Sequence, residues 1–98
     1  MKPTVPRYTM LKKGFKFEDI PFGPHGTGSG VQACVEFENG EWASIVGAMW
    51  YDGYARLYGD GVHTFEVLSS LTDKTSDCVL SYQTRRQVMY HLKKLQSL

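Results

Sequence analysis

The sequence predicts an α+β fold in which an antiparallel meander sheet of four to five strands follows an irregular N-terminal segment and carries one C-terminal helix on one face. Three observations favour this architecture. Apolar and polar residues alternate over residues 31–38 and again over residues 62–68, which is the period of half-buried strands. Turn dipeptides interrupt the middle of the chain at Asn39-Gly40, Asp52-Gly53 and Asp60-Gly61. Residues 84–97 instead space their apolar side chains as a helix does.

The length of 98 residues predicts one domain with one core. Its composition, 42% apolar and 21% charged, is ordinary for a globular protein. Within the domain 1–98 we expect an irregular segment over residues 1–30, an antiparallel sheet over 31–82 and a helix over 84–97. The first segment is irregular because it holds all four prolines, which lack a backbone donor.

Two stretches of this N-terminal segment allow an interpretation of their own. Residues 15–20 (FKFEDI) alternate apolar and charged residues and predict a short edge strand, the position where prolines are tolerated. The glycine-rich run over residues 22–30 (FGPHGTGSG) is interpreted as a connector. A phosphate-binding loop would continue with Gly-Lys-Ser/Thr into a helix, whereas this run leads into a strand.

A two-residue turn at Asn39-Gly40 would fix the register of the first hairpin. It predicts the pairs Glu38–Glu41, Phe37–Trp42, Val35–Ser44, Cys34–Ile45 and Ala33–Val46. Phe37 and Trp42 would then form a cross-strand aromatic pair. Apolar residues on both faces predict that one face packs on a helix while the other is partly covered or contacts a partner.

Three further strands and the helix follow. We expect short strands at residues 54–58 and 78–82, and a strand at 62–68 whose Phe65 and Val67 point inward. Thr84 and Gln87 fit a capping box at the start of the helix. The helix would bury one stripe, made of Val88, Leu92 and Leu95 with Met89 beside it.

The charges are unevenly distributed although the net charge is only +1. Both ends of the chain are basic and the middle is acidic. One interpretation is that the ends fold back and neutralise the sheet; the other is that the protein has one basic and one acidic face that steer charged partners. The sequence leaves both open and favours the first.

Cellular location is inferred from what the sequence contains. Cys34 and Cys78 fit small, buried or half-buried thiols in a reducing cytosol better than a disulfide. The longest apolar run, residues 43–51, is far shorter than the roughly 20 residues of a membrane span. The N-terminus has no apolar centre of a secretory signal. We expect a cytoplasmic protein that does not contact membranes.

Four stretches together resemble a known set of sequences: SIVG (44–47), YGDGVHTFEV (58–67), CVLSY (78–82) and QVMYHLKKLQSL (87–98). They are similar to a family of small tailed-phage accessory proteins, over about residues 44–98. The resemblance implies a phage-encoded protein of the host cytoplasm with a sheet and a closing helix, and it assigns no catalytic or binding residue. The connection between the last strand and the helix is shorter here than in that family.

The sequence predicts no enzyme, no metal and no cofactor. Asp60, His63 and Glu66 are close enough in sequence to suggest a zinc or acid–base site, but a turn followed by outward polar residues explains them better. A Cys34–His63 nucleophile pair would need an orienting group and an oxyanion site, and the sequence offers neither.

The predicted function is therefore that of a non-enzymatic binding protein. It would inhibit a host protein or protein–nucleic acid complex, such as a CRISPR complex or another nucleic-acid enzyme, with an acidic, aromatic-rich sheet. The predicted partner-binding residues are Glu36, Glu38, Glu41, Trp50, Tyr51, Asp52, Tyr54, Arg56, Tyr58 and Asp60. The alternative is a single-stranded nucleic-acid-binding module that uses the aromatics with Lys12, Lys13, Arg85 and Arg86. A homodimer through an edge strand is a further expectation.

Overall fold

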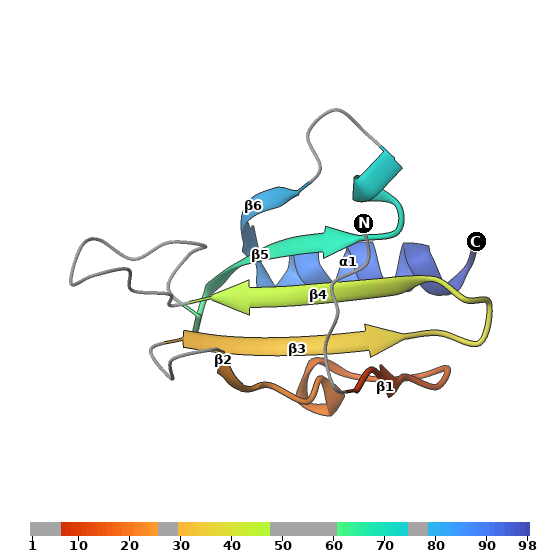
Figure 1. Cartoon of the computed structure of the whole chain (residues 1–98), viewed down its shortest axis with the longest axis horizontal. Helices are drawn as coiled ribbons and strands as arrows, with labels where there is room; N and C mark the ends of the chain where they lie inside the picture. Colours follow the sequence, from red (N-terminus) through yellow and green to blue (C-terminus); the bar gives the residue numbers. More distant parts are fainter. Residues whose placement is uncertain (1–6, 26–29, 48–60, 75–78) are drawn as a thin grey trace.

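The computed structural model describes residues 7–25, 30–47, 61–74 and 79–98. Its elements are β1 (Thr9–Met10), η1 (Phe17–Asp19), β2 (Gly23–His25), β3 (Gly30–Glu36), β4 (Trp42–Gly47), β5 (Thr64–Ser69), η2 (Thr72–Lys74), β6 (Leu80–Thr84) and α1 (Arg85–Gln96). The predicted α+β class is confirmed, because an open, mostly antiparallel sheet carries a C-terminal helix (Figure 1). The strand predicted at residues 54–58 and the Asp52-Gly53 turn lie outside the described residues.

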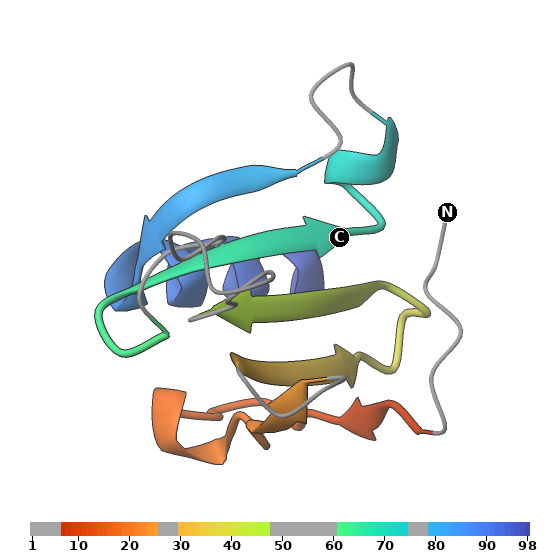
Figure 2. The ribbon, with the colours of Figure 1, turned by 60° about the vertical axis from the view of Figure 1, so that its left-hand side comes forward.

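Four strands form the main sheet in chain order. β3, β4, β5 and β6 are successive neighbours, and each neighbouring pair is antiparallel. Two short strands add to the free edge of β3: β1 pairs in parallel with its C-terminal end and β2 antiparallel with its N-terminal end. Figure 2 shows these N-terminal strands beside β3 and the helix along the far side of β4 and β5. The segment predicted as irregular therefore supplies one edge of the sheet.

The register of the β3–β4 hairpin differs by one residue from the prediction. Val35 pairs with Ala43 and Cys34 with Ser44, so all five predicted pairs are wrong. The loop contains three residues instead of two: Phe37 N–H bonds to the carbonyl of Glu41, and Gly40 N–H bonds to the carbonyl of Phe37, both at 2.9 Å. Gly40 has a φ of 88°, which places it as the left-handed residue that follows a type I turn.

This register separates the two aromatic residues that were predicted to pair. Trp42 lies opposite Glu36, while Phe37 is only 2% exposed and packs on the helix side of the sheet against Phe15, with ring centroids 5.9 Å apart. Because side chains alternate between faces, a shift of one residue moves the whole strand pattern to the other face. The gain is that Ala43 and Ile45 join Val35 in the core, where each is fully buried.

Residues 15–20 form no strand, contrary to the prediction, and contain the 3₁₀ turn η1. Asp19 accepts a hydrogen bond from the N–H of Lys16 at 2.8 Å, which satisfies the start of the turn. The turn directs Phe17 toward Phe65, with ring centroids 5.7 Å apart, and buries Ile20. The alternation of apolar and charged residues over 15–20 is therefore produced by a turn whose apolar side chains point into the core, and the same pattern also fits a strand.

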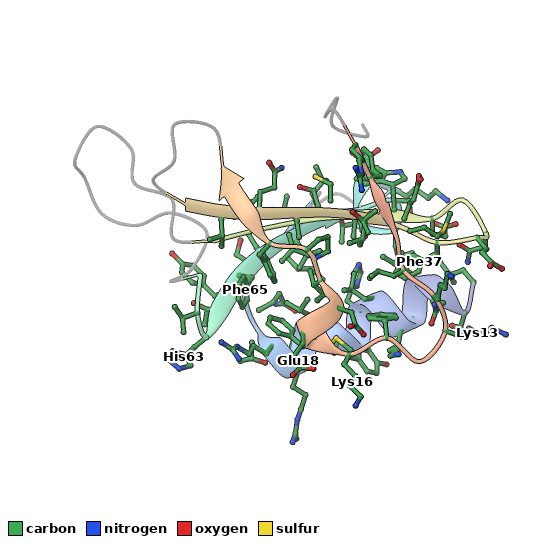
Figure 3. The ribbon with its side chains drawn as sticks, turned by 90° about the horizontal axis from the view of Figure 1, so that it is seen from below. Lys13, Lys16, Glu18, Phe37, His63 and Phe65 are labelled. Atoms are coloured by element: carbon green, nitrogen blue, oxygen red, sulfur yellow. The ribbon has the colours of Figure 1, made fainter. Side chains whose placement is uncertain are left out.

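The core lies between the sheet, the helix and this N-terminal segment. Phe65 and Val67 point inward as predicted, with 2% and 0% exposure. Figure 3 shows the Phe37 and Phe65 rings between the sheet and the helix. Further core side chains come from every layer: Leu11, Phe15, Ile20, Ala33, Val35, Ala43, Ile45, Val88, Leu92 and Leu95. Burying each large aliphatic side chain stabilises the fold by roughly 1.5–3 kcal/mol.

The helix begins where the sequence predicts. Thr84 accepts the N–H of Gln87 at 3.2 Å, and the Gln87 side chain accepts the N–H of Thr84 at 2.8 Å, which completes the capping box. The stripe of Val88, Leu92 and Leu95 is fully buried, as expected. The preceding strand is Leu80–Thr84, shifted from the predicted 78–82, so it runs directly into the helix. None of the helices described here has the length and apolar character required to cross a membrane.

Candidate functional site

The predicted acidic binding surface is described only in part. Glu38 is exposed in the hairpin loop, whereas Glu36 and Glu41 are half-buried. The carboxylate of Glu41 accepts a hydrogen bond from the hydroxyl of Ser70, which draws it toward the end of β5. The other predicted partner residues lie outside the described residues: Trp50, Tyr51, Asp52, Tyr54, Arg56, Tyr58 and Asp60.

The register assembles a distinct surface on the sheet, opposite the helix. This outer face consists of Gln32, Cys34, Glu36, Trp42, Ser44, Val46, Glu66 and Leu68. Glu36 and Glu66 occupy diagonal corners, and this set contains no cation. Burial raises the pKa of Glu66. Ser44 at the centre of the face and Trp42 beside Glu36 are buried at 5% and 8% exposure, so these positions present little aromatic surface.

Cys34 on this face is a free thiol that lacks the surroundings of a nucleophile. Burial raises its pKa, which keeps the thiol protonated. Its Sγ lies 3.9 Å from the hydroxyl of Ser44, and Gln32 Nε2 donates to the same hydroxyl at 3.1 Å. Burial, with Cys34 and Glu36 nearby, raises the pKa of Tyr8 to about 12. Cys78 lies outside the described residues, so the expectation of two unpaired thiols is tested only at Cys34.

A buried serine–histidine pair, which the sequence did not reveal, joins the sheet to the helix. Ser69 Oγ lies 2.7 Å from His91 Nε2 and accepts the N–H of Thr72 at 3.2 Å. We assign the hydroxyl proton to the contact with Nε2 and the imidazole proton to Nδ1, because within the described structure no other acceptor contacts Ser69 Oγ. Ser69 is 0% exposed, so a substrate cannot reach it. This pair is structural.

His91 also forms part of an open groove between β6 and α1. This helix groove has a volume of about 430 Å³ and is lined by Leu80, Gln83, Arg86, Gln87, Tyr90, His91 and Lys94. None of these described lining residues is acidic. Arg86, Tyr90 and Lys94 recur at i, i+4 and i+8, which places them in one row along the helix. Tyr90 is 73% exposed.

Local hydrogen bonds fix the two amide side chains of the helix groove. Gln87 uses its oxygen to cap Thr84, which leaves its NH₂ group as a donor. Gln83 donates from its NH₂ group to the carbonyl of Ser81 at 3.1 Å, which leaves its oxygen as an acceptor. The groove thus combines cations, an exposed aromatic ring and amide groups of both hydrogen-bonding senses.

Other described cations on this side of the sheet are two helix residues that make structural contacts and three exposed loop residues. Lys93 donates to the carbonyl of Phe15 at 2.9 Å and lies 3.8 Å from the centroid of that ring. Arg85 donates to the carbonyl of Val62 at 2.7 Å and lies over the ring of Phe17. Exposed cations of the neighbouring loop are Lys12, Lys13 and Lys16. Figure 3 shows Lys13 and Lys16, with Glu18, on the helix side of the sheet.

The exposed cations of the N-terminal loop have acidic neighbours: Glu18 and Asp19 lie in the same segment as Lys16, and Glu38 lines one hollow together with Lys12 and Lys13. The outer face of the sheet carries Glu36 and Glu66. Both interpretations of the charge pattern stay predictions. Among the described residues, no three potential ligands lie close enough together to hold a metal ion. His63 is exposed and Asp60 lies outside the described residues.

Comparison of the chain with protein-family models, curated proteins and solved structures found no match. The resemblance to tailed-phage accessory proteins stays a prediction. Of the basic residues predicted for nucleic-acid binding, the structure places Arg86 in the helix groove and gives Arg85 a structural contact. Sequence reasoning missed Tyr90 and Lys94, although their spacing from Arg86 on the polar side of the helix would have indicated them.

Proposed function

We propose that this protein binds single-stranded nucleic acid without catalysing a reaction on it. The observation that carries the proposal is the helix groove, where exposed Tyr90 lies in one row with Arg86 and Lys94 and no described lining residue is acidic. A positively charged groove with an exposed aromatic ring is the usual composition of a single-strand site, because every base has a face that can stack.

The charges of the groove lining favour the same surface. Arg86 and Lys94 are exposed cations of that lining, and none of its described residues is acidic. The sheet separates Arg86 and Lys94 from the carboxylates of Glu36 and Glu66, which face away from the helix. Repulsion of phosphates by these carboxylates is weak at that distance, since salt screens charges beyond roughly 10 Å.

The test is a fluorescence-anisotropy titration of the whole protein with a labelled single-stranded oligonucleotide at several salt concentrations. We expect the logarithm of the affinity to fall linearly with the logarithm of salt concentration, with a slope of roughly −0.7 for each phosphate contacted. Lys94→Glu and Arg86→Glu should each weaken binding and flatten this slope. Lys74→Glu is the matched control, because it makes the same charge change at an exposed site of η2 that does not line the groove. Absence of binding at low salt would exclude the function.

A second candidate is the predicted protein inhibitor, which would occupy a basic surface of a host nucleic-acid enzyme or defence complex. The observation in its favour is that Glu36 and Glu66 lie on the outer face of the sheet, opposite the helix, while Glu38 is exposed in the hairpin loop. Affinity capture from host cells would test it, with Glu38→Lys as the weakened variant. Failure to recover a partner that depends on Glu38 would argue against this role.

A further inference from the structure

We infer that the helix groove binds one nucleotide of the strand, with its base stacked on Tyr90 and its flanking phosphates held by Arg86 and Lys94. This inference rests on the proposed function and adds to it a defined subsite and a mode of recognition. The volume of about 430 Å³ lies in the range of small-molecule sites, roughly 300–1,000 Å³. A continuous strand could therefore place a single base there while its neighbours remain outside.

The row along the helix matches the order of groups in a nucleotide chain. Four residues separate Tyr90 from Arg86 and from Lys94, so the backbone positions of neighbouring members of the row are about 6 Å apart along the helix axis. A base stacked on the ring would have a phosphate on each side, and each phosphate would meet one cation. Arg86 offers a planar guanidinium that binds phosphate oxygens with two hydrogen bonds, whereas Lys94 acts as a point charge.

The amide groups provide contacts for the edge of the base. Gln87 presents an NH₂ donor because its oxygen is held by Thr84 N–H, and Gln83 presents an oxygen because its NH₂ group is held by Ser81. Nucleobases carry adjacent donors and acceptors on their exposed edges. A groove that offers one acceptor and one donor in fixed positions favours a base over a bare phosphate, because an ionised phosphate has no donor for the Gln83 oxygen.

The inner wall of the groove is rigid. His91 is held by the 2.7 Å contact with Ser69, and it is only 7% exposed. Leu80 adds an apolar surface from β6. Because these side chains are fixed before the ligand arrives, binding costs less ordering at the subsite.

The first experiment compares oligonucleotide affinities of Tyr90 variants of the full chain at one salt concentration. We expect Tyr90→Ala to weaken binding by roughly tenfold, the effect of losing one stacked base, and Tyr90→Phe to bind as the wild type does. Tyr82→Ala is the control, because Tyr82 is similarly exposed at 66% but does not line the groove. Tyr90 is exposed, so circular dichroism should show all three variants folded.

The second experiment records amide NMR spectra of the protein with adenosine 5′-monophosphate, with adenosine and with inorganic phosphate. We expect the side-chain amide signals of Gln83 and Gln87 to shift with the two adenine compounds and to stay in place with phosphate alone. Equal shifts with phosphate alone would overturn the assignment of a base to the groove.

The outcomes separate this inference from the proposed function. Salt-dependent oligonucleotide binding that Tyr90→Ala leaves unchanged would overturn the subsite and leave the function standing. No oligonucleotide binding at low salt would overturn both. Adenosine monophosphate that binds as tightly as the oligonucleotide would assign the groove to a free nucleotide and overturn its assignment to a strand.

Discussion

The hydroxyl of Ser69 at the end of β5 lies 2.7 Å from Nε2 of His91 in α1, and both side chains are buried. Burial lowers the pKa of His91 below its ordinary value of 6.5, and the charge of Lys94 lowers it further. The neutral imidazole therefore suits the folded protein, because it accepts the serine hydroxyl. Protonation would place a second donor against that hydroxyl in a buried site.

This pair predicts a loss of stability in mild acid. The unfolded chain binds a proton at His91 more tightly than the folded chain, so stability is fully present above pH 6.5 and falls as the pH decreases toward the lowered pKa. The slope from this residue is at most about 1.4 kcal/mol per pH unit. Urea unfolding of the wild type and of His91→Phe between pH 5 and 8 measures this contribution, as the difference between the two proteins in how the free energy of unfolding depends on pH. This comparison cancels the opposite contribution of Glu66, whose pKa burial raises. An unchanged slope in the variant would show that His91 does not titrate as described.

Replacing Ser69 by alanine removes the hydroxyl that contacts both His91 Nε2 and the N–H of Thr72. We expect Ser69→Ala to lower the free energy of unfolding by roughly 1–3 kcal/mol, because it leaves these buried polar groups without that partner. Denaturant unfolding at pH 8 provides the measurement, and Ser97→Ala at the exposed helix end serves as the control. Equal stability of Ser69→Ala and the wild type would contradict a structural role for the pair.

The side chain of Asn39 links the hairpin loop to the end of the helix. Its Nδ2 donates to the carbonyls of Leu95 at 2.9 Å and Leu98 at 3.0 Å, while its Oδ1 accepts the N–H of Glu41. Asn39→Asp keeps the acceptor but places a negative charge against the negative end of the helix. We expect a loss of about 1–2 kcal/mol in unfolding free energy, and Glu38→Gln in the same loop should change little. A fully stable Asn39→Asp variant would rule out this link.

Gly47, at the end of β4, lies so close to a neighbouring backbone segment that we expect only glycine to fit there. A Cβ there would lie 2.6 Å from the Cα of Gly61, a backbone atom that cannot move aside alone. Gly47→Ala should therefore destabilise the protein by roughly 1–3 kcal/mol or more through overpacking. Gly23→Ala is the matched control, because a Cβ at Gly23 meets nothing within 4 Å. Similar melting temperatures for the two variants would contradict the close approach.

The backbone of Tyr82 is strained, and replacing this residue should change the stability of the fold. It has a φ of 53° where the register shifts between β5 and β6, and left-handed backbone of this kind costs a non-glycine residue about 1 kcal/mol or more. Since its side chain is exposed, Tyr82→Gly should raise the free energy of unfolding by about 1 kcal/mol. Tyr82→Val should lower it, because a β-branched residue tolerates this backbone less well. Calorimetry of the two variants tests the opposite signs.

The helix and the inward face of β5 could be predicted because they depend on local chemistry. The Thr84–Gln87 capping box and the spacing of Val88, Leu92 and Leu95 specify a helix and its buried stripe within a few turns. The alternation around Phe65 and Val67 similarly identifies the buried side of a strand. Of the candidate site, only Arg86 among its cations was predicted for binding.

The sequence by itself therefore determined the fold class, the buried stripe of the helix and the position of the hairpin turn. Only the tertiary structure decided the hairpin register, because Asn39-Gly40 fits both a two-residue and a three-residue loop, and burial of Ala43 and Ile45 accompanies the longer one. The tertiary structure also brought β6 beside the row of Arg86, Tyr90 and Lys94. A helix has several polar rows, and the sheet that packs beside it determines which row borders a groove.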